Sequence, residues 1–176
     1  MDFIDDEDLR HKADNALKYA TYLMLSHYKN SNENFKEETC RVIVLYIASI
    51  LEAVLLYLYS KQGKKIEKIE YKEITILKPV FQNKENGGET VLAIKTKKVI
   101  SENNIGIHEL IKHFEKNKII TKAETGVGLN EINEMRNTHH LSKDRNQKCT
   151  IIDVEKALEM LIYTLEKVPL ILSKSK

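Results

Sequence analysis

The segment from Val42 to Tyr59 constrains the fold most, because it is almost continuously apolar. Its length approaches the roughly 20 residues that a membrane-spanning helix needs. Glu52 lies in its middle, where a charge costs about 2.5–3.5 kcal/mol on insertion scales, and the chain has no second run of this kind. We therefore interpret the segment as the central helix of a bundle, buried nearly all round, and not as a membrane span.

Length and composition indicate an ordinary globular protein. A chain of 176 residues is most simply one domain and can bury a substantial core. The net charge of +2 neither requires nor excludes a nucleic-acid partner. The acidic N-terminus lacks the basic region of a signal peptide, and Cys40 and Cys149 are expected to be free, buried thiols in a reducing compartment. We expect a cytoplasmic protein with no membrane attachment.

Apolar residues at helical spacing predict four or five helices. The predicted ranges are about 5 to 28, 34 to 61, 105 to 117, a helix from 129 that carries Arg136, and 153 to 168. We expect Asn34 or Ser31 to cap the second helix, Asp153 to cap the last one, and Pro169 to end or kink it. The predicted inward stripe of the last helix is Val154, Leu158, Leu161, Ile162 and Leu165.

Residues 69 to 99 differ from the rest, because apolar and polar residues alternate there on both sides of a turn sequence at 83–88. This pattern predicts a β-hairpin, and Pro79 near the end of its first strand suits a sheet edge. Lys95, Lys97 and Lys98 form either a basic finger or a solvated strand edge that lysines protect from aggregation. The predicted fold class is therefore mainly α, a single domain over 1–176 built as a bundle of four to five helices with an inserted hairpin at 69–99.

The segment from Leu129 to His140 places two polar groups on the apolar side of a helix. At about 100° per residue, one face carries Leu129, Ile132, Arg136 and His140. Arg136 and His140 are four apart, so their side chains are neighbours. Such a pair needs a partner, a polar pocket or a second subunit. The alternative is a surface helix whose polar C-terminal end extends beyond the core into solvent. Glu131 and Glu134 fall on the opposite face.

Common active-site motifs are missing from the sequence. It has no glycine-rich phosphate loop, no GxSxG, no paired CxxC and no HExxH. His108 and His113 are five apart, so they do not stack on one helical face as zinc ligands would. We expect no cofactor and no metal site, and any catalysis must depend on Arg136, His140 and their neighbours.

Three passages, Leu51–Leu58, Ile107–Lys116 and Leu129–Lys143, together with the order of the helices, resemble the HEPN superfamily (higher eukaryotes and prokaryotes nucleotide-binding). The resemblance covers roughly residues 8–61 and 104–170, with the hairpin as an insertion. It implies a helical bundle that often dimerises, and many members are metal-independent ribonucleases. Their motif is an arginine, commonly followed by a polar residue, and then a histidine.

The motif is matched in part by this sequence. Arg136 and Asn137 fit it, but His140 follows Arg136 after three intervening residues and His139 after two, which is shorter than the usual spacing. This departure bears on nuclease activity more than on fold. The implied catalytic set is Arg136, His140, Asn137 and His139.

The chemistry of metal-free RNA cleavage suits these residue types. The 2′-OH of RNA acts as an internal nucleophile, a histidine with a reference pKa of about 6.5 can exchange its proton, and an arginine can hold the phosphate oxygens. Asn137 either orients one of these groups or is a plain surface amide. The basic residues that follow, Lys143, Arg145 and Lys148, either steer RNA or are simply solvated.

Three hypotheses remain open. The first is an endoribonuclease of the toxin or phage-defence type, with a composite Arg/His site at a homodimer interface formed by the helix that bears Arg136. The second is a non-catalytic HEPN-like module that binds RNA, a nucleotide or a cognate protein partner. The third is a helical interaction protein in which Arg136 and His140 are structural. In every case we expect Glu52 to be buried and paired, with Arg41, Lys12 or Arg136 as the candidate cation.

Overall fold

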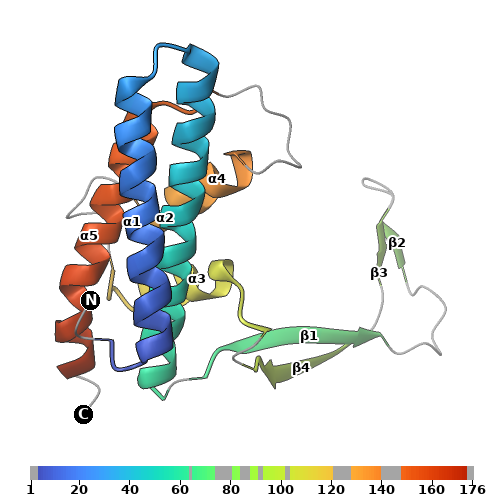
Figure 1. Ribbon diagram of the computed structural model, residues 1–176. Helices are drawn as coiled ribbons and strands as arrows, with labels where there is room; N and C mark the ends of the chain where they lie inside the picture. The colour runs from blue at the N-terminus through green and yellow to red at the C-terminus, as the bar shows by residue number, and fades with distance from the viewer. Residues whose placement is uncertain are drawn as a thin grey trace. The chain divides into compact units, whose positions relative to one another are not determined.

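The predicted fold class is confirmed by a computed structural model, which describes residues 4–63, 65–73, 81–83, 88–90, 93–101, 104–120, 128–139 and 148–173. Within this part, the chain is mainly α-helical, with five helices and two small antiparallel strand pairs (Figure 1). It forms two compact units, Met1–Lys64 with Gly106–Lys176 and, separately, Lys65–Ile105. That residues 1–176 act as one domain stays a prediction.

The helical unit contains α1 (Glu7–Lys29), α2 (Glu33–Lys61), α3 (Ile107–Lys116), α4 (Leu129–His139) and α5 (Ile151–Ser173). The carboxylate of Asp6 caps α1 by accepting a hydrogen bond from the Leu9 backbone N–H at 3.0 Å. Asn32 caps α2 in the same way through Phe35 at 3.2 Å. The predicted cap at Asn34 or Ser31 is wrong, because α2 starts at Glu33 and so Asn34 lies inside its first turn.

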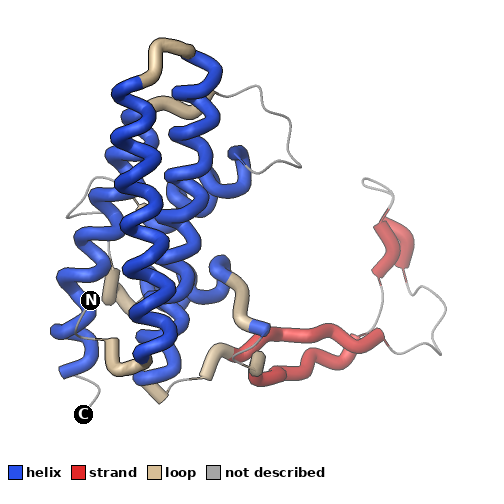
Figure 2. Tube along the Cα trace, viewed as in Figure 1, coloured by secondary structure: helices blue, strands red, loops and turns tan. Residues whose placement is uncertain are grey.

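Helix α2 is central, since α1, α3, α4 and α5 all pack against it (Figure 2). Its core residues, each at most 1% exposed, are Cys40, Ile43, Val44, Ile47, Ala48, Leu51, Val54, Leu55 and Leu58. Burial all round is nevertheless wrong for one side of α2. Tyr46 and Ser49 are exposed there, and with residues of α1 they line an apolar groove of about 360 Å³.

By length and composition, α2 is the one described helix that could cross a membrane. Within the bundle, 61% of its most apolar 18-residue window is buried. The core helix of a soluble protein has the same length and composition, so this finding is compatible with the predicted core helix.

Helix α5 begins and ends differently from the prediction. It starts at Ile151, and the carboxylate of Asp153 in its first turn accepts hydrogen bonds from the backbone N–H and the hydroxyl of Thr150, at 2.8 and 3.0 Å. It then continues through Pro169 to Ser173, so the predicted end near Val168 is wrong. Buried Val168 and Ile171 flank the proline, and we attribute the continuation to their packing, which offsets the lost backbone hydrogen bond.

The inward stripe of α5 is rotated from the predicted one. Ile162 is 55% exposed, whereas Ala157, Met160 and Thr164 are fully buried. The buried Thr164 hydroxyl lies 3.7 Å from the sulfur of Met160, which gives it a local partner. A small residue and a threonine therefore occupy the side that faces the core, and the branched Ile162 falls outside it.

Both cysteines are free and buried, as predicted. Burial raises the pKa of Cys40 to about 11 and that of Cys149 to about 12. The sulfur of Cys40 lies 3.6 Å from Nδ1 of His27. At neutral pH both thiols are protonated, so neither is a nucleophile.

The predicted hairpin is confirmed in the second unit. Strand β1 (Glu67–Glu73) pairs antiparallel with β4 (Ala93–Val99), with Glu67 opposite Val99, and β2 (Phe81–Asn83) pairs with β3 (Gly88–Thr90). The outer pair begins slightly before the predicted start at residue 69. Pro79 and residues 84–87 lie outside the described residues.

Candidate functional site

The first half of α4 anchors the helix in the core. Leu129 and Ile132 are 3% and 1% exposed, as their shared face predicted. The helix packs against α2, α3 and α5. One turn after Ile132, the same side of α4 presents Arg136 towards α2.

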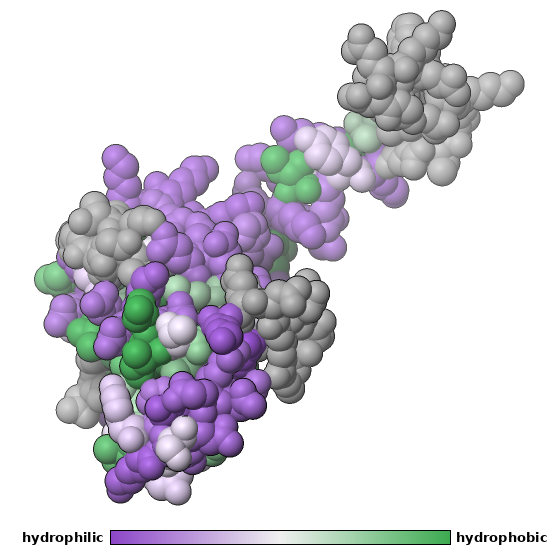
Figure 3. All heavy atoms as spheres, turned by 90° about the horizontal axis from the view of Figure 1, so that it is seen from above, coloured by the Kyte–Doolittle hydropathy of each residue, from purple (hydrophilic) through white to green (hydrophobic). Residues whose placement is uncertain are grey.

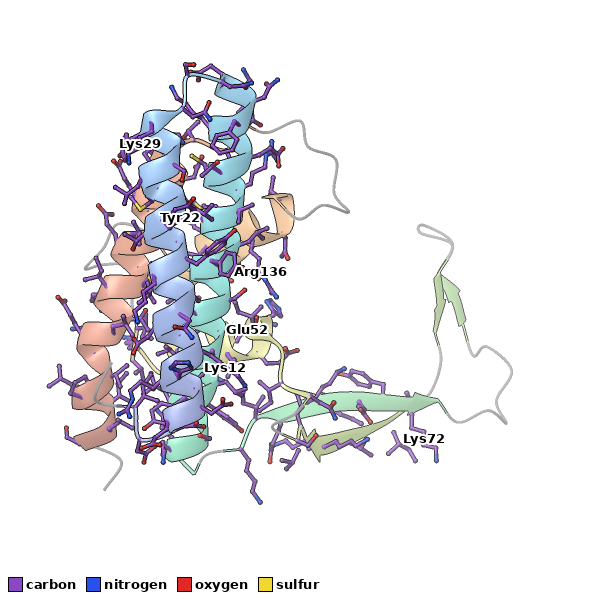
Figure 4. All side chains as sticks on the ribbon, viewed as in Figure 1. Lys12, Tyr22, Lys29, Glu52, Lys72 and Arg136 are labelled. Carbon is purple, nitrogen blue, oxygen red and sulfur yellow. The ribbon has the colours of Figure 1, made fainter. Side chains whose placement is uncertain are left out.

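Arg136 forms an ion pair with Glu52 of α2, with Nη2 3.2 Å from Oε2 (Figure 4). The prediction that Glu52 is paired with a cation is confirmed, and Arg136 is the partner among the three candidates. Full burial of Glu52 is wrong, because the two side chains are 32% (Arg136) and 31% (Glu52) exposed. Glu52 adjoins the exposed side of α2, so its carboxylate avoids the cost of complete desolvation.

The other two candidate cations pair within their own helices. Arg41 contacts Glu37 and Glu38 of α2. Lys12 lies 2.6 Å from Asp8 of α1. Glu52 therefore links α2 to α4, the helix that bears the sequence motif.

The Arg136–Glu52 ion pair orients Arg136 and leaves part of its guanidinium accessible to solvent. A partly exposed ion pair contributes only about 0.2–1 kcal/mol to stability. A guanidinium carries five N–H donors, and the contact with Glu52 uses one of its nitrogens. Arg136 is therefore held in one direction while solvent still reaches it, which suits a group that must grip an anion.

Helix α4 carries two further polar side chains, Asn130 and Asn133, before Arg136. Asn130 donates from Nδ2 to Oε2 of Glu115 on α3, at 2.8 Å. Asn133 lies about 60° from Arg136 around the helix, and its buried Oδ1 has no hydrogen-bond donor among the described residues. Sequence reasoning missed Asn133, although its spacing of three from Arg136 could have found it.

The opposite side of α4 lines a separate groove of about 430 Å³. Its lining residues are Glu131, Glu134, Met135 and Thr138, together with Lys148, Asp153 and Lys156. Glu131 and Glu134 thus face away from Arg136, as predicted. Lys148, proposed from the sequence to steer RNA, is exposed and belongs to this groove, not to the Arg136 side.

The other predicted site residues are described only in part. Asn137 is exposed, as a plain surface amide would be. His139 is the last residue of α4, and its side chain is not among those described. His140, Lys143 and Arg145 lie outside the described residues, so their roles stay predictions. Among the described residues, no group of three or more His, Cys, Asp or Glu side chains could hold a metal ion.

In comparisons with known proteins, no family model, no curated protein and no solved structure matches the chain. The HEPN resemblance therefore depends on the three sequence passages and on the helical order.

Proposed function

We propose that the chain is a HEPN-like, metal-independent endoribonuclease of the toxin or phage-defence type, active in the cytoplasm as a homodimer. The observation that carries this proposal is the Arg136–Glu52 pair. It holds a guanidinium at a solvent-accessible position, four residues before His140 in the sequence.

Each group has a defined role in the proposed reaction. Arg136 grips two oxygens of the scissile phosphate and stabilises the charge that gathers on them. Glu52 fixes the direction of Arg136, which limits the entropy lost when phosphate binds. The imidazole of His140 accepts the proton of the 2′-OH. The 2′-oxygen then bonds to phosphorus, the P–O5′ bond breaks, and the departing 5′-oxygen takes a proton from solvent water, while the imidazolium returns its proton to solvent.

A second copy of the chain completes the proposed site. The polar groups of α4 occupy a face whose earlier turn is apolar and buried. A second subunit that covers this face would leave a polar groove with an arginine and a histidine from each chain. RNA entering that groove would meet donors from both subunits.

Cleavage should persist in excess chelator and should leave a 2′,3′-cyclic phosphate. The reason is that the 2′-OH and the protein side chains supply every group that the reaction needs. Mass spectrometry of the fragments, with and without EDTA, measures both features. Chelator-sensitive activity, or 5′-phosphate products with free 3′-hydroxyls, would contradict the mechanism.

The same ion pair also favours a second candidate, a non-catalytic module in which Arg136 joins α4 to α2. Such a module would bind RNA, a nucleotide or a cognate protein without turnover. Purified protein that cleaves no RNA under any of these conditions would favour this candidate.

A further inference from the structure

The β1–β4 ribbon exposes both of its faces. The described side chains of β1, from Glu67 to Lys72, and all those of β4 are exposed. Tyr71 is 67% exposed and Ile94 is 52% exposed. A two-stranded ribbon is only marginally stable in water, so an exposed ring such as that of Tyr71 gains from a bound partner.

The register sorts the side chains into two faces, because directly opposite residues share a face and successive residues alternate. One face carries the pairs Tyr71 with Lys95, Ile69 with Lys97, and Glu67 with Val99. The other face carries Lys68 with Lys98, Glu70 with Thr96, and Lys72 with Ile94. Hydrophilic side chains dominate the described ribbon, with apolar groups between them (Figure 3).

The charges of the ribbon are only partly compensated. Nζ of Lys97 lies 3.1 Å from Oε2 of Glu67, whereas none of the acidic side chains that the structure describes pairs with Lys95. Lys68 lies directly opposite Lys98, and like charges in that position repel. An anion that neutralises them would stabilise the ribbon.

We propose that this ribbon binds single-stranded RNA, with a base stacked on Tyr71 and a phosphate held by Lys95. Aromatic rings flanked by cations bind single strands with little sequence preference. The lysines of the other face add general attraction for the backbone. Lysine is depleted at protein–protein interfaces. The five lysines of the two strands outnumber their three glutamates, so this surface favours RNA over a protein partner. The inference rests on the proposed function only in taking RNA as the ligand.

The test measures binding of a single-stranded 2′-O-methyl RNA to the full chain by fluorescence anisotropy. Methylation blocks the 2′-oxygen nucleophile, so binding is separated from cleavage. Tyr71→Ala and Tyr71→Leu should each weaken binding about tenfold or more, because the stacking ring is lost. Tyr71→Phe should bind like the wild type. Ile94→Ala, a truncation of an exposed side chain on the opposite face, is the matched control and should also leave binding unchanged.

A salt series tests the phosphate contact of Lys95. Lys95→Gln should reduce the slope of log affinity against log salt concentration by about 0.7, the value for one phosphate on a single strand. Three results would each overturn the proposal. They are a Tyr71→Leu protein that binds RNA with wild-type affinity, a Tyr71→Phe protein that loses as much affinity as Tyr71→Ala, and duplex RNA that binds as tightly as the single strand. Absence of cleavage together with Tyr71-dependent binding would overturn only the proposed nuclease, and cleavage without Tyr71-dependent binding would overturn only the RNA-binding ribbon.

Discussion

Arg136→Lys should slow RNA cleavage by about 100-fold or more, while the protein stays folded. Lysine can keep the ion pair with Glu52, but it lacks the planar fork that grips two phosphate oxygens. Loss of one donor that stabilises developing charge typically costs about 100- to 1,000-fold in rate. Single-turnover cleavage and a thermal melt of the same preparation measure the two effects.

Arg10→Lys provides the matched control for this change. Arg10 lies on α1, with Nη2 3.9 Å from Oε1 of Glu7 in the same helix, so it is a surface arginine with an acidic neighbour but does not join two helices. Its replacement should leave both the rate and the melting temperature unchanged. If Arg136→Lys cleaves RNA at the wild-type rate and merely shifts the melting temperature, the Arg136–Glu52 pair is structural and the nuclease proposal fails.

His140→Ala should abolish cleavage without unfolding the protein, because it removes the group that moves the proton and leaves a good helix former. His139→Ala should matter less. The helical repeat of the sequence predicts His140 on the same side of Arg136 as Asn133, and His139 on the side of Ile132. Cleavage rates of both variants, with circular dichroism of each, measure this difference.

The histidine pair supplies its own control, since the two changes are identical and adjacent. A larger loss in His139→Ala than in His140→Ala would mean that the shorter spacing from Arg136 is the catalytic one. Full activity in both variants would contradict the proposal that a histidine accepts the proton of the 2′-OH.

The sequence predicted the helices well where the burial pattern repeats over several turns. Helix α3, for example, was predicted at 105 to 117, and its buried residues Ile107, Leu110, Ile111 and Phe114 recur at helical spacing. The cap of α2 was missed because several neighbouring residues are good caps, and only the path of the chain selects Asn32. The end of α5 was missed because tertiary packing around Pro169 outweighs its local preference.

Of the candidate site, the sequence predicted only that a buried charge must have a partner of opposite charge. A carboxylate inside an apolar run needs a partner, so pairing of Glu52 followed from the sequence. The choice of Arg136 over Arg41 and Lys12 did not, because it depends on how α4 crosses α2. Asn133 was missed because its spacing of three from Arg136 was not followed, and the burial of its Oδ1 is known only from the structure.

The central claim is that an arginine and a histidine from two subunits form one RNA-cleaving site. Subunit exchange between the Arg136→Ala and His140→Ala proteins tests it most directly. Each variant alone should be inactive, and the mixture should recover cleavage, because a mixed dimer pairs the intact Arg136 of one chain with the intact His140 of the other. An active wild type with a mixture that stays inactive after verified exchange would contradict a composite site.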